Sequence, residues 1–304
     1  MVKIIAALVG VASLAGIGLL VAIRMNGPAV LDLVDRIAGP ASGVEMVQQA
    51  RYGADPAQKL RVYRQGEAGE AKPVFLFFHG GAWAHGDPDD YGFIARNIAP
   101  AGYLVVLGGY RMNEPGRYPA MLQDSASATR WVRDNIARYG GDPDRIVLSG
   151  HSAGAYNAVQ IALDGRWLEE AGVPETAVGG VVGLSGPYDF YPFDKPRAKA
   201  AFESVGAGPD SQPVNHVGPD APPMLLVHGE ADTVVRIRNS RALAKALGEA
   251  GASVETLYLP GKAHNDPLLA LTNPWRRDPL VFDRVVRFLR QSTEVSVPVQ
   301  AETP

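Results

Sequence analysis

The stretch "LSGHSAGAY", residues 148–156, places a serine between two glycines at the end of an apolar run. The pattern predicts a strand that ends just before Ser152 and a helix over residues 153–163 that begins directly after it. A serine at so sharp a turn has a strained backbone that only small neighbours permit, and its hydroxyl projects into a cleft. G-x-S-x-G therefore predicts a nucleophile at Ser152. The alternative is that Ser152 only caps the helix. The chain contains 34 glycines, so a serine flanked by two of them can also arise by chance.

Length and composition restrict the classes of protein to consider. The 304 residues suffice for one large domain or at most two small ones. A net charge of −3 gives no electrostatic reason to expect nucleic acid as a partner. The chain has no cysteine, which excludes disulfides, thiolate metal sites and cysteine nucleophiles but does not identify a compartment.

The N-terminal segment differs from the rest of the chain. Residues 4–23 carry no charge and would form a helix about 30 Å long, the thickness of a bilayer's hydrocarbon core. We expect residues 1–25 to be an uncleaved membrane anchor with the rest of the chain periplasmic or extracellular. A cleaved signal peptide and a buried core helix remain alternatives. Residues 26–43 are expected to be a connector with one short amphipathic stretch, "VLDLVDRIA".

The rest of the chain alternates strand-like and helix-like stretches, which predicts a catalytic domain over residues 44–292 and a tail over residues 293–304. Two alternating stretches suggest an antiparallel hairpin, and helical patterns separate the later apolar runs. The expected buried strands are residues 74–78, 103–107, 146–148, 178–184, 224–227 and 254–259. This order predicts an α/β fold with a mostly parallel central sheet flanked by helices, a small lid between residues 184 and 224, and chemistry at the carboxyl ends of the strands.

A second motif, "FFHGGAW" at residues 77–83, follows one of these strands. Its glycines let the backbone approach a substrate oxygen without an intervening side chain. The N–H groups around Gly80, Gly81 and Ala82, together with that of Ala153, are predicted to form an oxyanion hole.

Other side chains near these motifs are candidates for structural support or substrate contact. His79 is interpreted as a structural residue that holds its loop by hydrogen bonds. Trp83 and His151 are the candidates for substrate contact, although packing explains Trp83 as well. His151 is too close to Ser152 in sequence to turn back onto its hydroxyl, so we expect it to line the cleft.

A nucleophilic serine needs a base and an acid, and the chain has six histidines. His264 lies in a loop directly after the last strand, free to reach the serine, and is the predicted base. His228 ends a strand and is interpreted as a strand-end hydrogen bonder. Asp232, just past a strand end, is the predicted acid because it preserves the chain order serine, acid, histidine. Asp189 is the rival, and either aspartate could instead cap a helix.

With these residues in place, the chain resembles the α/β-hydrolase superfamily, and within it the hormone-sensitive-lipase-like and the feruloyl- and acetyl-xylan-esterase-like carboxylesterases. The motifs that carry the resemblance are His79–Trp83, Gly150–Gly154 and His228–Val235, and it extends from about residue 55 to 290. The lipase-like branch often reads H-G-G-G in this loop, whereas Ala82 and Trp83 follow the two glycines here, which favours the xylan-esterase-like and arylformamidase-like side.

The resemblance implies a serine esterase that hydrolyses small to medium carboxylic esters through an acyl-enzyme, without cofactor or metal. Two alternatives remain open. An arylformamidase or amidase would use the same three residues on an N-acyl bond, and a non-catalytic ligand-binding protein could share the fold. The expected partners are a small-molecule ester and, through the N-terminal segment, a membrane. The sequence does not predict the oligomeric state.

Overall fold

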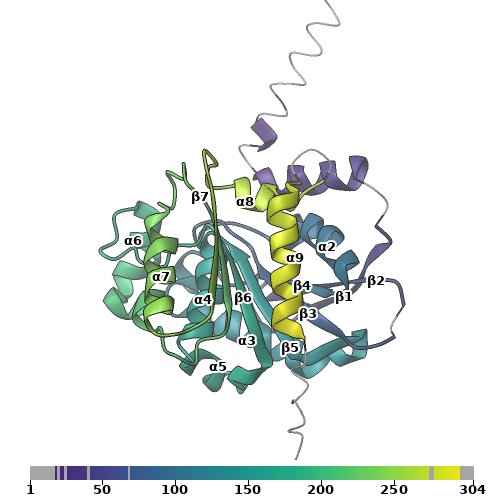
Figure 1. The fold of residues 1–304 in the computed structure, drawn as a ribbon, viewed down its shortest axis with the longest axis horizontal. Helices are drawn as coiled ribbons and strands as arrows, with labels where there is room; N and C mark the ends of the chain where they lie inside the picture. Colours follow the sequence, from purple (N-terminus) through teal and green to yellow (C-terminus); the bar gives the residue numbers. More distant parts are fainter. Residues whose placement is uncertain are drawn as a thin grey trace, which may run out of the picture.

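An eight-stranded sheet forms the centre of the protein, in the order β1-β2-β4-β3-β5-β6-β7-β8 (Figure 1). The computed structural model describes residues 18, 21–23, 26–39, 42–67, 69–273 and 277–294. The strands are β1 (Val44–Arg51), β2 (Lys59–Gln65), β3 (Lys72–Phe78), β4 (Leu104–Gly108), β5 (Gly141–His151), β6 (Val178–Leu184), β7 (Met224–Gly229) and β8 (Val254–Leu259). Every apolar run predicted as a strand overlaps one of them, and the only predicted residue outside is Tyr103, directly before β4.

Strand direction agrees with the prediction from the sequence. β1 and β2 form the expected antiparallel hairpin, and β2 also pairs antiparallel with β4. All the remaining neighbours, from β4 through β8, are parallel. The carboxyl ends of these parallel strands meet at one edge of the sheet, where loops bring distant parts of the chain together.

Helices cover both faces of the sheet (Figure 1). Alternate residues of β3 enter two separate cores: Val74, Leu76 and Phe78 pack on one side, Phe75 and Phe77 on the other. Because both faces are buried, this strand is a continuous apolar run rather than an alternating one. The first core includes residues of α3 (Ala120–Asn135), α4 (Ala153–Leu163) and α7 (Arg238–Glu249), and the second includes residues of α2 (Gly92–Ile98), α8 (Asp266–Leu269) and α9 (Pro279–Thr293).

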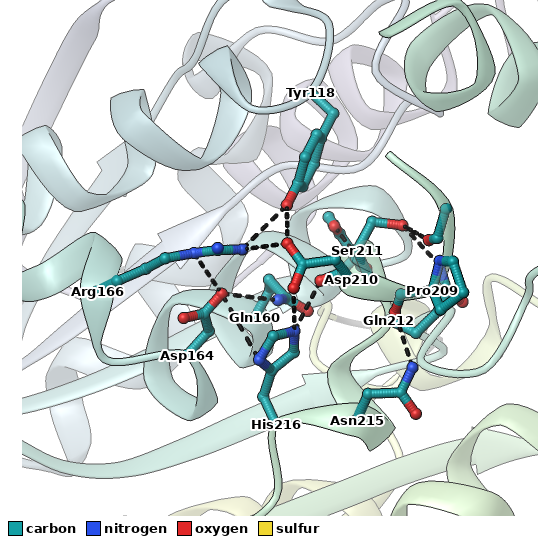
Figure 2. A network of polar contacts seen from close by, with 12 residues as sticks. Tyr118, Gln160, Asp164, Arg166, Pro209, Asp210, Ser211, Gln212, Asn215 and His216 are labelled. Carbon is teal, nitrogen blue, oxygen red and sulfur yellow. Dashed lines mark hydrogen bonds and ion pairs between the residues drawn. The ribbon is translucent and has the colours of Figure 1, made fainter. Parts of the chain in front are cut away.

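The segment between β6 and β7 is the predicted small lid, and it contains one short α-helix, α6 (Pro196–Phe202). A polar network fastens it to the rest of the protein, as Figure 2 shows. Asp210 accepts hydrogen bonds from Arg166 of α5 (Arg166–Glu170) at 2.7 Å and from the Tyr118 hydroxyl at 3.3 Å. The Nε2 of His216 donates to the backbone carbonyl of Asp210 at 2.7 Å. The His216 bond is internal to the segment, whereas Arg166 and Tyr118 hold the segment from outside it.

At the N-terminus, residues 26–38 form a helix that is fastened to α2. Arg96 contacts the buried carboxylates of Asp32 and Asp35, each at 2.6 Å, and Asn97 donates to Asp35 at 3.1 Å. The stretch expected to be a connector is thus packed against the domain through ion pairs.

The predicted anchor lies almost wholly outside the described residues. Of residues 4–23, only 18 and 21–23 are described. In the part of the chain that the structure describes, no helix is long and apolar enough to cross a membrane.

Candidate active site

Ser152 lies at the turn between β5 and α4, in a strained conformation with a positive φ of 54° and ψ −117°. Gly150 and Gly154, two residues before and two residues after Ser152, must be glycine because an added Cβ would collide with backbone atoms. A Cβ at Gly150 would lie 2.3 Å from the carbonyl carbon of Gly154, and a Cβ at Gly154 would lie 2.1 Å from the carbonyl oxygen of Phe78. The G-x-S-x-G pattern thus has a physical cause here: the strained turn packs its own backbone, and that of β3, too closely for any side chain.

The structure brings Ser152, His264 and Asp232 into one line of hydrogen bonds. The Oγ of Ser152 lies 3.0 Å from Nε2 of His264, and Nδ1 of His264 lies 2.7 Å from Oδ2 of Asp232. The imidazole donates from Nδ1 to the carboxylate, so its Nε2 is free to accept the serine proton. The residues come from three different strand ends, as predicted. The rival Asp189 donates its backbone N–H to Asn239 at 2.9 Å and has no contact with His264 among the described residues.

Asp232 is fixed in position by donors on both of its oxygens. Oδ1 accepts from the backbone N–H groups of Val234 and Val235, at 2.8 and 2.9 Å, and Oδ2 is contacted by His228 as well as His264. Burial alone would raise the pKa of this carboxyl, but hydrogen bonds from the two histidines hold the pKa well below its usual range. Asp232 is therefore ionised at neutral pH and can stabilise an imidazolium at His264.

The loop that carries His264 is held against the end of β7. The N–H of Ala263 donates to Asp266 at 2.6 Å, and the N–H of Ala231 donates to the carbonyl of Lys262 at 2.9 Å. A Cβ at Gly229 would lie 2.3 Å from that same carbonyl oxygen. The close approach of the two loops, which sets His264 beside Asp232, therefore requires glycine at position 229.

The predicted oxyanion loop has three consecutive residues with positive φ angles. Gly81, Ala82 and Trp83 have φ angles of 129°, 52° and 57°. Within the described residues, the N–H groups of Gly81, Ala82 and Ala153 donate to no other group of the chain. Gly80, the fourth predicted donor, already makes a backbone hydrogen bond with the Tyr91 hydroxyl, so it is not among the free donors. Unpaired N–H groups are what stabilisation of an oxyanion requires, and the N-terminal end of α4 adds to the positive potential.

His79 holds that loop in place through a hydrogen bond and an aromatic contact. It is 1% exposed, donates from Nδ1 to the carbonyl of Gly80 at 2.8 Å, and stacks on Tyr110 with ring centroids 4.5 Å apart. Burial lowers the pKa of His79 to about 4, so the ring is uncharged at neutral pH. These contacts agree with its interpretation as a structural residue.

The two candidates for substrate contact are both largely buried. Trp83 is 5% exposed, donates from Nε1 to Asn157 at 3.1 Å, and packs edge-on against Tyr156 and Phe202. His151 is 4% exposed and donates from Nε2 to the backbone carbonyl of His264 at 3.1 Å. Packing thus accounts for Trp83, and His151 supports the loop that carries His264. Substrate contact by either residue stays a prediction.

Comparison with known proteins shows which family and which relatives the chain resembles. The BD-FAE family profile matches residues 60–247. Esterase LipC of Mycobacterium tuberculosis is 32% identical over 246 residues, which are 73% of this chain and 61% of that protein. Isoprenylcysteine alpha-carbonyl methylesterase ICME of Arabidopsis thaliana is 31% identical over 260 residues, 77% of this chain and 60% of that protein. The chain thus spans about three fifths of the length of these relatives.

Solved structures share the fold. A thermostable esterase from Pseudomonas putida superposes with a TM-score of 0.70 at 24% identity, covering 89% of this chain and 90% of that one. A truncated carbohydrate esterase from gut microbiota gives the same TM-score and identity, and covers 84% of this chain and 99% of that one. At this identity the likeness establishes the architecture alone.

Proposed function

Because the chain belongs to the BD-FAE family of α/β-hydrolases, we propose that it is a carboxylic ester hydrolase in which Ser152, His264 and Asp232 form the catalytic triad. One observation carries the proposal: the unbroken line from Ser152 to His264 at 3.0 Å and on to Asp232 at 2.7 Å. The relatives' names, which are those of esterases, support the same class of reaction.

The reaction proceeds in two steps. His264 takes the proton of the Ser152 hydroxyl while Oγ attacks the ester carbonyl, and Asp232 stabilises the imidazolium that forms. The N–H groups of Gly81, Ala82 and Ala153 stabilise the tetrahedral oxyanion. The imidazolium then protonates the leaving alcohol. Water, activated by the same histidine, releases the acid from the acyl-enzyme and restores the free serine.

The short segment between β6 and β7, the predicted lid, favours small to medium substrates. It is short, and its aromatic residues Phe190 and Phe202 pack around Trp83 instead of covering a long channel. An N-acyl substrate remains the second candidate, because the same three groups would attack an amide carbonyl. A panel of p-nitrophenyl esters of increasing acyl length, assayed beside N-formylaniline, tests the proposal. We expect ester hydrolysis that falls off with long acyl chains. Faster turnover of the formamide would show an arylformamidase, and no turnover of either class would contradict the proposal.

We further propose that residues 4–23 anchor the protein in a membrane, with the catalytic domain periplasmic or extracellular. The uncharged segment is long enough to span, and the fastened helix that follows it leaves Leu33 and Ile37 exposed, at 54% and 75%. Membranes from cells that express the full chain are washed with carbonate at high pH. An anchored protein stays with the membranes. Release by the wash, or a mature N-terminus beginning after residue 20, would contradict the anchor.

A further inference from the structure

Two histidines contact Asp232, although the proposed reaction uses only one of them. His228 lies on β7 and its side chain is fully buried. Its Nε2 lies 3.1 Å from Oδ2 of Asp232, the same oxygen that His264 contacts at 2.7 Å. A strand-end hydrogen bond explains a histidine at this position, but it does not explain why the bond is made to the catalytic carboxylate.

The surroundings of His228 fix which of its nitrogens carries the proton toward Asp232. Nε2 also lies 2.8 Å from the backbone carbonyl oxygen of Val235. A carbonyl and a carboxylate can only accept, so Nε2 is the donor. On the other side of the ring, Nδ1 lies 2.7 Å from Oγ of Ser240 on α7, a fully buried hydroxyl that can donate to it. Both ring nitrogens are thus held, and the ring cannot turn without losing a buried hydrogen bond.

We propose that His228 is a positioning residue for ester hydrolysis, whose Nε2–H holds Oδ2 of Asp232 at the point from which that oxygen orients His264. This inference rests on the function proposed above. The backbone N–H groups of Val234 and Val235 hold only Oδ1. Without His228, Oδ2 would keep a single partner among the residues that the structure describes, the imidazole of His264. The donor from β7 therefore keeps the carboxylate in place while His264 exchanges protons with Ser152 and the leaving group.

Two substitutions of His228, whose side chains differ by one methylene, distinguish a role in positioning the Asp232 carboxylate from a role in filling space. His228→Gln places a side-chain N–H near the position of Nε2, whereas the shorter His228→Asn reaches only to the position of Nδ1. We expect the asparagine variant to lose kcat on p-nitrophenyl acetate by about ten- to a hundredfold with KM nearly unchanged, since a hydrogen bond to a charged group is lost. The glutamine variant should retain kcat within a few-fold. His216→Gln, outside the triad, is the matched control.

A double-mutant cycle with Asp232→Asn tests whether the effect passes through the carboxylate. If His228 acts on catalysis only through Asp232, His228→Asn should change kcat by less than about threefold in the Asp232→Asn background. Thermal unfolding of each variant reports any general loss of stability separately, and the glutamine variant keeps the test available if the asparagine variant does not fold.

The outcomes are distinct. Equal kcat in the glutamine and asparagine variants, or the same loss with and without the Asp232 carboxylate, would overturn the positioning role while leaving the proposed function intact. An inactive wild-type protein would overturn the proposed function itself.

Discussion

Two buried histidines beside the site make the stability of the protein depend on pH. Burial lowers the pKa of His79 to about 4, and burial together with the neighbouring His264 lowers the pKa of His151 to about 3, from an ordinary value of 6.5. Since both folded-state pKa values lie below the unfolded value, the unfolded chain binds more protons between pH 6.5 and the folded pKa. The free energy of unfolding should therefore be highest above pH 6.5 and fall as the pH falls through this window.

The pKa shifts of His79 and His151 determine how strongly the free energy of unfolding depends on pH. At pH 5 an unfolded histidine is almost fully protonated, whereas His79 and His151 in the folded protein are almost fully neutral. Each histidine should then lower the free energy of unfolding by about 2 kcal/mol relative to pH 8, or about 4 kcal/mol together. The carboxyl of Asp232 adds nothing in this window, because its pKa is depressed and its contribution is lost only below its ordinary value of 3.8.

Urea unfolding followed by tryptophan fluorescence, at intervals from pH 8 to pH 5, measures this dependence. His151→Gln keeps a donor toward the carbonyl of His264 but removes one titrating group. We expect the slope of the free energy of unfolding near pH 5 to fall by about 1.3 kcal/mol per pH unit, which corresponds to one proton. The matched control is His216→Gln, the same change at a partly exposed histidine. An unchanged slope in His151→Gln would refute the reasoning.

Two further predictions concern the acid and the serine turn. Asp232→Asn should lower kcat on p-nitrophenyl acetate by about four orders of magnitude, because the imidazole of His264 loses its orienting partner. Asp189→Asn should change kcat less than tenfold. The reverse ranking would place the acid after β6. Gly154→Ala should lower the free energy of unfolding by about 1–3 kcal/mol, because its Cβ would lie 2.1 Å from the Phe78 carbonyl oxygen. Gly248→Ala, a helical position with no atom within 4 Å of the added Cβ, should instead raise it by about 0.5–1 kcal/mol, and equal effects in chemical denaturation would count against the contact argument.

The sequence was most informative where a local pattern has one physical cause. The apolar run at residues 74–78 predicts a strand buried on both faces because no polar residue alternates within it. The glycines on either side of Ser152 predict a tight turn because no side chain fits there. The family prediction, made from three short motifs, was confirmed by the profile match.

Contacts between distant residues were not predictable in the same way. Arg96 is one of many charged residues in the sequence, and nothing local shows that Asp32 and Asp35, more than 60 positions away, would bury against it. The position of His228 at the end of a strand predicted a hydrogen bond, but its partner depends on how the loop after β7 folds back. The H-x-x-x-D spacing of His228 and Asp232 is the one signal that could have indicated their contact.

Covalent labelling of the full chain tests the central claim most directly. Diethyl p-nitrophenyl phosphate transfers a diethylphosphoryl group to an activated serine and releases p-nitrophenol, which is counted by absorbance, and peptide mass spectrometry then locates the adduct. We predict one p-nitrophenol for each chain, an adduct on the peptide that contains Ser152, and no reaction in Ser152→Ala. An adduct at another residue, or labelling of Ser152→Ala at the wild-type rate, would contradict the assignment of Ser152 as the nucleophile.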